Sequence, residues 1–105
     1  MTPRCTLPLV PALLLGISVS AYAATIEIAM ENLVIAPAAA SAEVGDTIQW
    51  VNKDIFAHTA TARNGDWDVT LPPKKSAMLV LKKAGTLDYY CRFHPNMKAT
   101  LTVAP

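Results

Sequence analysis

Short runs of β-forming residues, separated by turn residues roughly every ten positions, constrain the fold of this 105-residue chain most strongly. From residue 24 onward, no segment keeps the apolar period of a helix over several turns. Apolar and polar residues alternate instead, and glycines, prolines and an Asn-Gly pair mark the breaks. Strands are therefore predicted over residues 26–30, 46–51, 59–62, 76–81, 86–91 and 98–103.

This many short strands in one small domain predicts an all-β fold, a β-sandwich of two sheets with Greek-key connections. Trp50 and Tyr89 fall within predicted strands and are expected in the core, whereas Tyr90 should face the sheet surface. Met30 and Met78 are also expected to be core residues, because methionine usually fills apolar interiors.

The first 23 residues have the pattern of a secretory signal peptide. Arg4 is followed by an apolar run over 9–20 and by Ala21-Tyr22-Ala23, which has the small residues that a signal peptidase requires. Cleavage after Ala23 would leave a single exported domain over 24–105. A retained membrane anchor is the alternative, but the apolar run is short for a bilayer span and no charged cluster follows it.

The charges argue against nucleic acid as a partner, because nine basic and eight acidic residues are scattered rather than clustered. Four lysines near predicted turns have two interpretations, a basic rim for docking or ordinary solvated turn residues. They are Lys74, Lys75, Lys82 and Lys83.

Cys5 lies within the predicted signal peptide, so the mature domain would keep a single cysteine, Cys91. An unpaired thiol in an oxidising compartment needs an explanation. An inert core thiol and a redox-sensing thiol are two possibilities. A disulfide between the two cysteines would require the signal peptide to be retained.

A thiol, an imidazole and a thioether recur at intervals of three in Cys91, His94 and Met97, and Pro95 turns the chain between them. Such a short loop can direct all three side chains at one point, and His58 supplies a second imidazole from the start of another predicted strand. Two His, one Cys and one weak Met are the ligands of blue-copper electron-transfer sites. Zinc is the competing metal, but it has no use for the thioether.

The chain resembles the cupredoxins, the blue copper proteins, and is most similar to amicyanin and plastocyanin-like members. The similarity spans nearly all of residues 24–105, and the spacing Cys91-x-x-His94-x-x-Met97 resembles the short amicyanin loop. It implies a single plastocyanin/amicyanin-like copper-binding domain with three strong copper ligands and an axial Met97. The strong ligands would be His58, Cys91 and His94. The segments that carry the similarity are 44–52, 57–59, 85–91 and 94–98.

The resemblance also implies a function, a type 1 copper ion that shuttles single electrons between partners in the periplasm. Electrons would pass through an exposed edge of His94, within an apolar patch. The partners would be redox proteins met transiently, of the c-type cytochrome or dehydrogenase class, and the mature protein would be a monomer outside the membrane. Candidates for the patch are Ile55, Phe56, Phe93 and Pro95.

The sequence departs from the family pattern next to two of these ligands. Relatives commonly carry an Asn after the first histidine, which bonds to the loop beyond the cysteine, whereas this chain has Thr59. Arg92 stands where Ser or Thr is frequent, so the contacts that orient the ligands are expected to differ. Asp66-Trp67-Asp68 also replaces what is usually a simple turn.

An enzyme is not expected, because two histidines are too few for the second copper centre of a multicopper oxidase or nitrite reductase. The alternative function is a periplasmic copper-binding protein for delivery or storage. That function favours an open site rich in Met or His, whereas a closed His₂CysMet set inside a rigid sandwich favours electron transfer.

Overall fold

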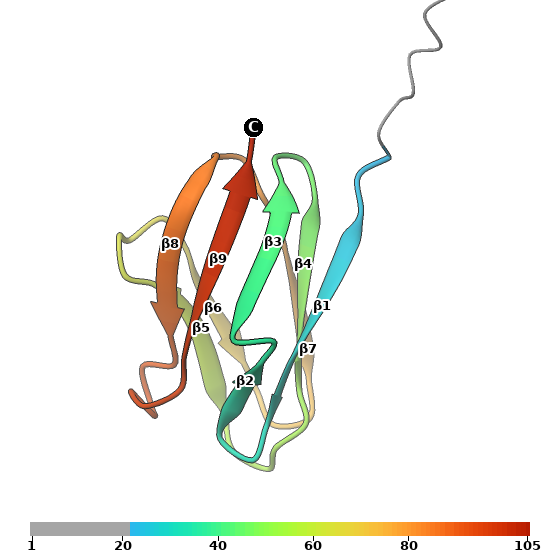
Figure 1. The fold of residues 1–105 in the computed structure, drawn as a ribbon. Coiled ribbons are helices and arrows are strands. Elements are labelled where there is room, and N and C mark those ends of the chain that lie inside the picture. The colour runs from blue at the N-terminus through green and yellow to red at the C-terminus, as the bar shows by residue number, and fades with distance from the viewer. Residues whose placement is uncertain (1–21) are drawn as a thin grey trace, which may run out of the picture.

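The computed structural model describes residues 22–105, which form nine strands and no helix. The strands lie in two sheets that face each other (Figure 1). Within these residues no helix is long and apolar enough to cross a membrane. Nearly all of the expected signal peptide, including Cys5, lies outside the described residues. The strands are β1 (Thr25–Glu31), β2 (Val34–Ala36), β3 (Ala39–Glu43), β4 (Thr47–Asn52), β5 (His58–Ala62), β6 (Asp68–Leu71), β7 (Ser76–Val80), β8 (Gly85–Tyr90) and β9 (Lys98–Ala104).

The first sheet has the order β2-β1-β4-β7 and the second the order β3-β9-β8-β5-β6. Two neighbouring pairs are parallel, β1 with β4 and β3 with β9, and the others are antiparallel. The chain therefore changes sheet repeatedly, as Greek-key connections require. This arrangement confirms the prediction of an all-β sandwich of two sheets.

The core lies between the sheets, and its largest side chains are aromatic. Trp50 and Tyr89 are fully buried, as predicted, and the indole Nε1 of Trp50 donates a hydrogen bond of 3.3 Å to the Tyr89 hydroxyl. Burial raises the pKa of Tyr89 to about 12, although the bond from Trp50 acts in the opposite direction. The half-buried Trp67 lies on both rings, at centroid distances of 5.2 and 5.3 Å, so the Asp-Trp-Asp segment contributes to the core.

Met78 is not a core residue, which corrects the expectation from the sequence, whereas Met30 is fully buried as expected. Met78 lies on β7, an edge strand of the first sheet, and 63% of its surface is exposed. The side chains of a strand alternate between its faces, and in β7 the partly buried positions belong to Ala77 and Leu79. The register of β7 therefore directs Met78 to solvent.

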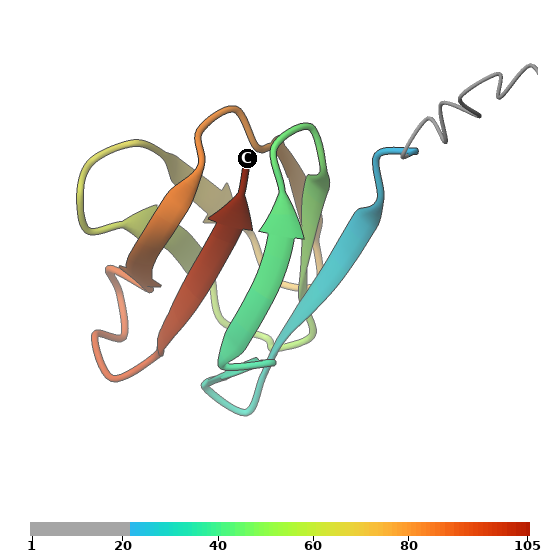
Figure 2. The ribbon, with the colours of Figure 1, turned by 45° about the horizontal axis from the view of Figure 1, so that its top comes forward.

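The four lysines do not form a single rim. Lys74 and Lys75 precede β7, whereas Lys82 and Lys83 follow it, at the opposite end of the sandwich (Figure 2). Lys83 there contacts a carboxylate oxygen of Asp66 at 3.4 Å. Only the first pair lies at the end of the sandwich that carries the candidate ligands.

Asp46 ties the start of β1 to the turn between β3 and β4. Its carboxylate accepts hydrogen bonds from the backbone N–H groups of Ala24 and Glu43, at 2.8 and 2.9 Å. These bonds hold the pKa of Asp46 below its usual value.

Candidate metal centre

The candidate ligands meet at the end of the sandwich opposite the C-terminus, where the β4–β5 and β8–β9 connections lie close together (Figures 1 and 2). His58 is the first residue of β5, and Cys91 follows directly after β8. His94 and Met97 belong to the connection that leads into β9. Residues far apart in the sequence are thus brought together because β5 and β8 are hydrogen-bonded neighbours.

Three of the predicted ligand atoms form a compact triangle. The Nδ1 atoms of His58 and His94 are 3.2 Å apart, and the Cys91 Sγ lies 3.8 and 3.7 Å from them. A point equidistant from the three atoms lies about 2.1 Å away from each, close to the lengths of metal–imidazole and metal–thiolate bonds. His58 and Cys91 are fully buried and His94 is half-buried, so the triangle fits one metal ion with a single ligand near solvent.

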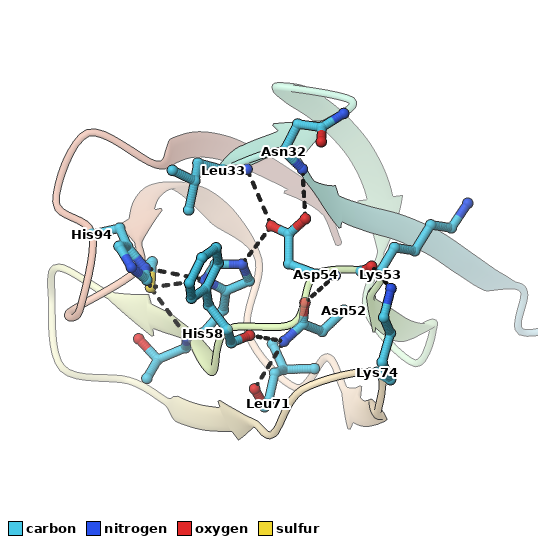
Figure 3. Close-up of polar contacts among 12 residues, drawn as sticks. Asn32, Leu33, Asn52, Lys53, Asp54, His58, Leu71, Lys74 and His94 are labelled. Carbon is cyan, nitrogen blue, oxygen red and sulfur yellow. Dashed lines mark hydrogen bonds and ion pairs between the residues drawn. The ribbon is translucent and has the colours of Figure 1, made fainter.

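His58 is oriented by Asp54, a residue whose role the sequence analysis missed. Figure 3 shows the Asp54 carboxylate between the His58 ring and the backbone of Asn32 and Leu33. It accepts hydrogen bonds from His58 Nε2 at 2.8 Å and from the two backbone N–H groups at 2.7 and 3.1 Å. Because an ionised carboxylate only accepts, Nε2 carries the ring proton and Nδ1 offers its lone pair to the triangle.

The electrostatics of Asp54 agree with this assignment. Burial raises the pKa of the carboxyl, but the hydrogen bonds from His58, Leu33 and Asn32 together outweigh it and leave the pKa below its usual value. The carboxylate therefore stays ionised near neutral pH and keeps the ring in the ligating tautomer.

Asn52 shapes the connection that carries Asp54. The two N–H groups of its side-chain amide lie within hydrogen-bond distance of three backbone carbonyl oxygens, so one hydrogen is shared, and its own carbonyl accepts the Asp54 N–H at 2.9 Å (Figure 3). Asn52 is 1% exposed, so water does not replace these bonds. The carbonyls belong to Phe56 (2.7 Å), Leu71 (3.1 Å) and Pro72 (3.2 Å).

The other ligand segment is closed by its own backbone. The N–H of Cys91 donates to the carbonyl of Met97, that of Met97 to His94, and that of His94 to Cys91, at 2.9, 2.8 and 3.2 Å. These bonds join Cys91, His94 and Met97 in a ring. Two of the bonds span three residues, which is the spacing seen in the sequence, and the third closes the loop across six.

Thr59 links the two ligand segments, at the position where the family resemblance implied an Asn. Its backbone N–H donates to Cys91 Sγ at 3.3 Å, and its hydroxyl oxygen accepts the N–H of Arg92 at 2.8 Å. The link between the two segments is therefore kept with a different residue. Threonine has a shorter side chain than asparagine, but its hydroxyl still reaches the N–H of Arg92, the residue after the cysteine.

Met97 lies in the core beside the site, with 2% of its surface exposed. Its backbone belongs to the ring of bonds that holds Cys91 and His94. Its role as a fourth, axial ligand stays a prediction.

A family model described as a cupredoxin-like domain matches residues 6–103. No curated protein matches the sequence. Among solved structures, a reduced amicyanin variant is 25% identical with a TM-score of 0.65, over 75% of this chain and 81% of that chain. Amicyanin from Paracoccus versutus is 21% identical with a TM-score of 0.66, over 75% and 80% of the two chains.

A copper-containing nitrite reductase from Thermus scotoductus is also similar, with 23% identity and a TM-score of 0.69. The similarity covers 77% of this chain and only 22% of the enzyme chain. It therefore concerns the fold of one part of that enzyme. Taken with the donor atoms, the likenesses make the triangle of His58, Cys91 and His94 a candidate type 1 copper site.

Proposed function

This chain belongs to the cupredoxin-like domain family, and we propose that it is a blue copper protein that carries single electrons between redox partners. The observation that carries the proposal is the triangle of two imidazole nitrogens and one thiol sulfur, with sides of 3.2 to 3.8 Å. A copper ion held there would supply one-electron exchange between Cu(I) and Cu(II).

The protein's own hydrogen bonds support rapid exchange, because they fix the orientation of the candidate ligands. Asp54 fixes the ring of His58, and the Thr59 N–H donates to Cys91 Sγ. Ligands positioned in this way need to move little when the charge of the site changes. We propose Met97 as the axial ligand, since a weak thioether completes such a site.

Electrons would enter and leave through His94, the half-buried ligand. Large apolar side chains are exposed near it, with Ile55 72%, Phe56 51% and Phe93 53% exposed. The Phe56 ring lies 6.2 Å from the His94 ring, centroid to centroid. A small apolar surface of this kind suits brief encounters between a monomeric carrier and a c-type cytochrome or a dehydrogenase.

We also propose that residues 1–23 are a cleaved signal peptide and that the mature protein works in the periplasm. The buried thiol of Cys91 supports this proposal, because a cysteine held among metal ligands needs no disulfide partner in an oxidising compartment.

Copper delivery or storage is the alternative. It is disfavoured because His58 and Cys91 are fully buried, so release of an ion would require the two ligand segments to separate. An enzymatic role is disfavoured because both histidines of the sequence belong to the one site, which leaves none for a second copper centre.

The test is the visible absorption spectrum of the chain from residue 24 after addition of one equivalent of Cu(II). We expect an intense band in the red that Cys91→Ser abolishes, because the band arises from the thiolate bond to copper. Met78→Leu, which changes an exposed methionine, should leave the band unchanged. A wild-type protein that binds copper without the band would support delivery or storage, and one that binds no copper would exclude both functions.

Met97→Leu, compared with Met78→Leu, tests the axial ligand separately. We expect the copper midpoint potential to shift only in the first variant, because only that variant removes a thioether beside the site. Equal potentials in the two variants would contradict the axial role of Met97.

A further inference from the structure

A chain of hydrogen bonds runs from the surface of the second sheet to the ligand loop. The N–H of Arg92 donates to Thr59 Oγ1 at 2.8 Å, and the hydroxyls of Thr59 and Thr61 are 2.8 Å apart. The Thr61 hydroxyl in turn donates to Asp68 Oδ1 at 2.7 Å. The chain thus crosses from the residue after Cys91, through β5, to the first residue of β6.

The chemistry of the end groups fixes the direction of every bond between them. The ionised carboxylate of Asp68 only accepts, so the Thr61 hydroxyl gives its single hydrogen to Asp68. Thr61 then has none left for Thr59, so Thr59 donates its own hydrogen to Thr61 while its oxygen accepts from the Arg92 N–H. Because Thr59 is fully buried, water is not available as a substitute partner for its hydroxyl.

Asp68 also accepts a hydrogen bond of 3.2 Å from Arg92 Nε, so the chain closes on the residue where it began. The hydroxyl of Thr61 and the side chain of Arg92 hold the pKa of Asp68 below its usual value. The ion pair itself is exposed, with Arg92 and Asp68 side chains 40% and 51% accessible, and such pairs contribute little alone. The hydroxyls of Thr59 and Thr61, rather than the ion pair, therefore connect Asp68 to the ligand loop.

We propose that Thr61 and Asp68 are positioning residues for the copper ligands, acting through the Thr59 hydroxyl to hold the ligand loop against β5. Thr59 contacts the loop on both sides of one peptide, at Cys91 Sγ and at the Arg92 N–H. Fixing its hydroxyl therefore fixes the position of the thiol relative to His58. The proposal rests on the proposed copper function only for the effect on the metal, since the hydrogen bonds belong to the protein alone.

The first test is amide hydrogen exchange at Arg92 in the copper-free protein. Thr61→Val keeps the shape of the side chain and removes its hydroxyl, so exchange at Arg92 should become about tenfold faster, as the loss of one buried hydrogen bond allows. Asp68→Ala should accelerate it less, about threefold, because Thr61 is half-buried and can donate to water. Thr61→Ser restores the hydroxyl and should restore the wild-type rate.

Thr86→Val is the matched control. It removes one hydroxyl of a threonine pair that does not contact the ligand loop, in which Thr86 Oγ1 donates to Thr102 Oγ1 at 3.3 Å between β8 and β9. Arg92 exchange should remain at the wild-type rate in this variant. Exchange within twofold of wild type in Thr61→Val, or equal acceleration in Thr86→Val, would overturn the proposal.

The second readout is the copper-loaded protein. Thr61→Val should shift the position of the red absorption band and the midpoint potential, and Thr61→Ser should return both to wild type. Faster exchange at Arg92 with an unmoved band and potential would overturn the positioning role. If wild type has no red band, the copper function fails, and the exchange rates alone then decide whether Thr61 and Asp68 hold the loop.

Discussion

The two histidines of the site lie in regions that are built in different ways. In segment 52–58 side chains hold the backbone, and Asn52, Asp54 and His58 are all buried. In segment 91–97 the backbone holds itself through the ring of bonds among Cys91, His94 and Met97, and Phe93 and Pro95 are exposed.

The difference separates two tasks that a carrier must perform at one metal. A buried network of side chains fixes one imidazole and keeps water away, whereas a self-bonded loop can present the other imidazole to solvent without losing its shape. If this division is correct, equivalent substitutions in the two segments will have unequal effects.

The largest effect is expected for Asn52→Ala, which should lower the free energy of unfolding by about 3 kcal/mol. The loss follows because buried backbone groups in segment 52–58 lose their partners. Asn96→Ala, in the exposed part of segment 91–97, should change it by less than about 0.5 kcal/mol. Urea unfolding measures both, and equal losses would remove the distinction between the segments.

Asp54→Asn should weaken copper binding by a factor of about 10 to 100. An amide facing Nε2 can donate to it, which allows His58 to place its proton on Nδ1 and so blocks the ligand atom. A competition titration with a chelator measures the affinity. Asp88→Asn, which alters an exposed carboxylate that accepts from the Thr100 hydroxyl, should retain wild-type affinity, and a matching loss there would refute the tautomer argument.

Phe93→Ala should slow electron self-exchange about tenfold, since it removes apolar contact area beside His94 that two molecules would share. Nuclear magnetic resonance line broadening in mixtures of reduced and oxidised protein gives the rate. Val80→Ala, an exposed apolar residue on β7, is the control. A similar decrease in both variants would show that the encounter does not use the surface beside His94.

The smallest expected effect is on the pH dependence of the free energy of unfolding. The stability that Asp68 contributes is complete above the free carboxyl pKa of about 3.9 and is lost as pH falls through its lower value in the folded protein. Wild type should therefore lose more unfolding free energy between about pH 5 and about pH 3 than Asp68→Asn does. Identical losses in urea unfolding at the two pH values would show that this carboxylate does not tether segment 91–97.

Much of the fold was predictable because alternation is a local property of the chain. The six predicted strands are all present, and most of their ends differ from the predicted positions by one residue. The strands missed are β2, β3 and β6, which have three to five residues. β3 has the sequence AASAE, with no β-branched residue, and it forms by parallel pairing with β9 at the other end of the chain.

The candidate site also has residues that could be predicted from the sequence and residues that could not. Cys91 and His94 were predictable as neighbours because they share one short loop, and in the structure a ring nitrogen of His58 lies beside them. Asp54 stands four residues before His58, but in a connection without regular geometry that spacing does not reveal a contact. Asn52 comes directly after the predicted strand 46–51, and only the folded chain shows which carbonyls it reaches.

The hydrogen bond between Ala24 N and Asp46 would change if the proposed signal peptide were cleaved. In the uncut chain this nitrogen is an ordinary amide, but cleavage after Ala23 would make it a charged ammonium group facing a carboxylate at 2.8 Å. Proteolytic removal of the leader would then add an ion pair that the uncut chain lacks. Cleavage would thus create the charge that binds the new N-terminus of the exported form to Asp46.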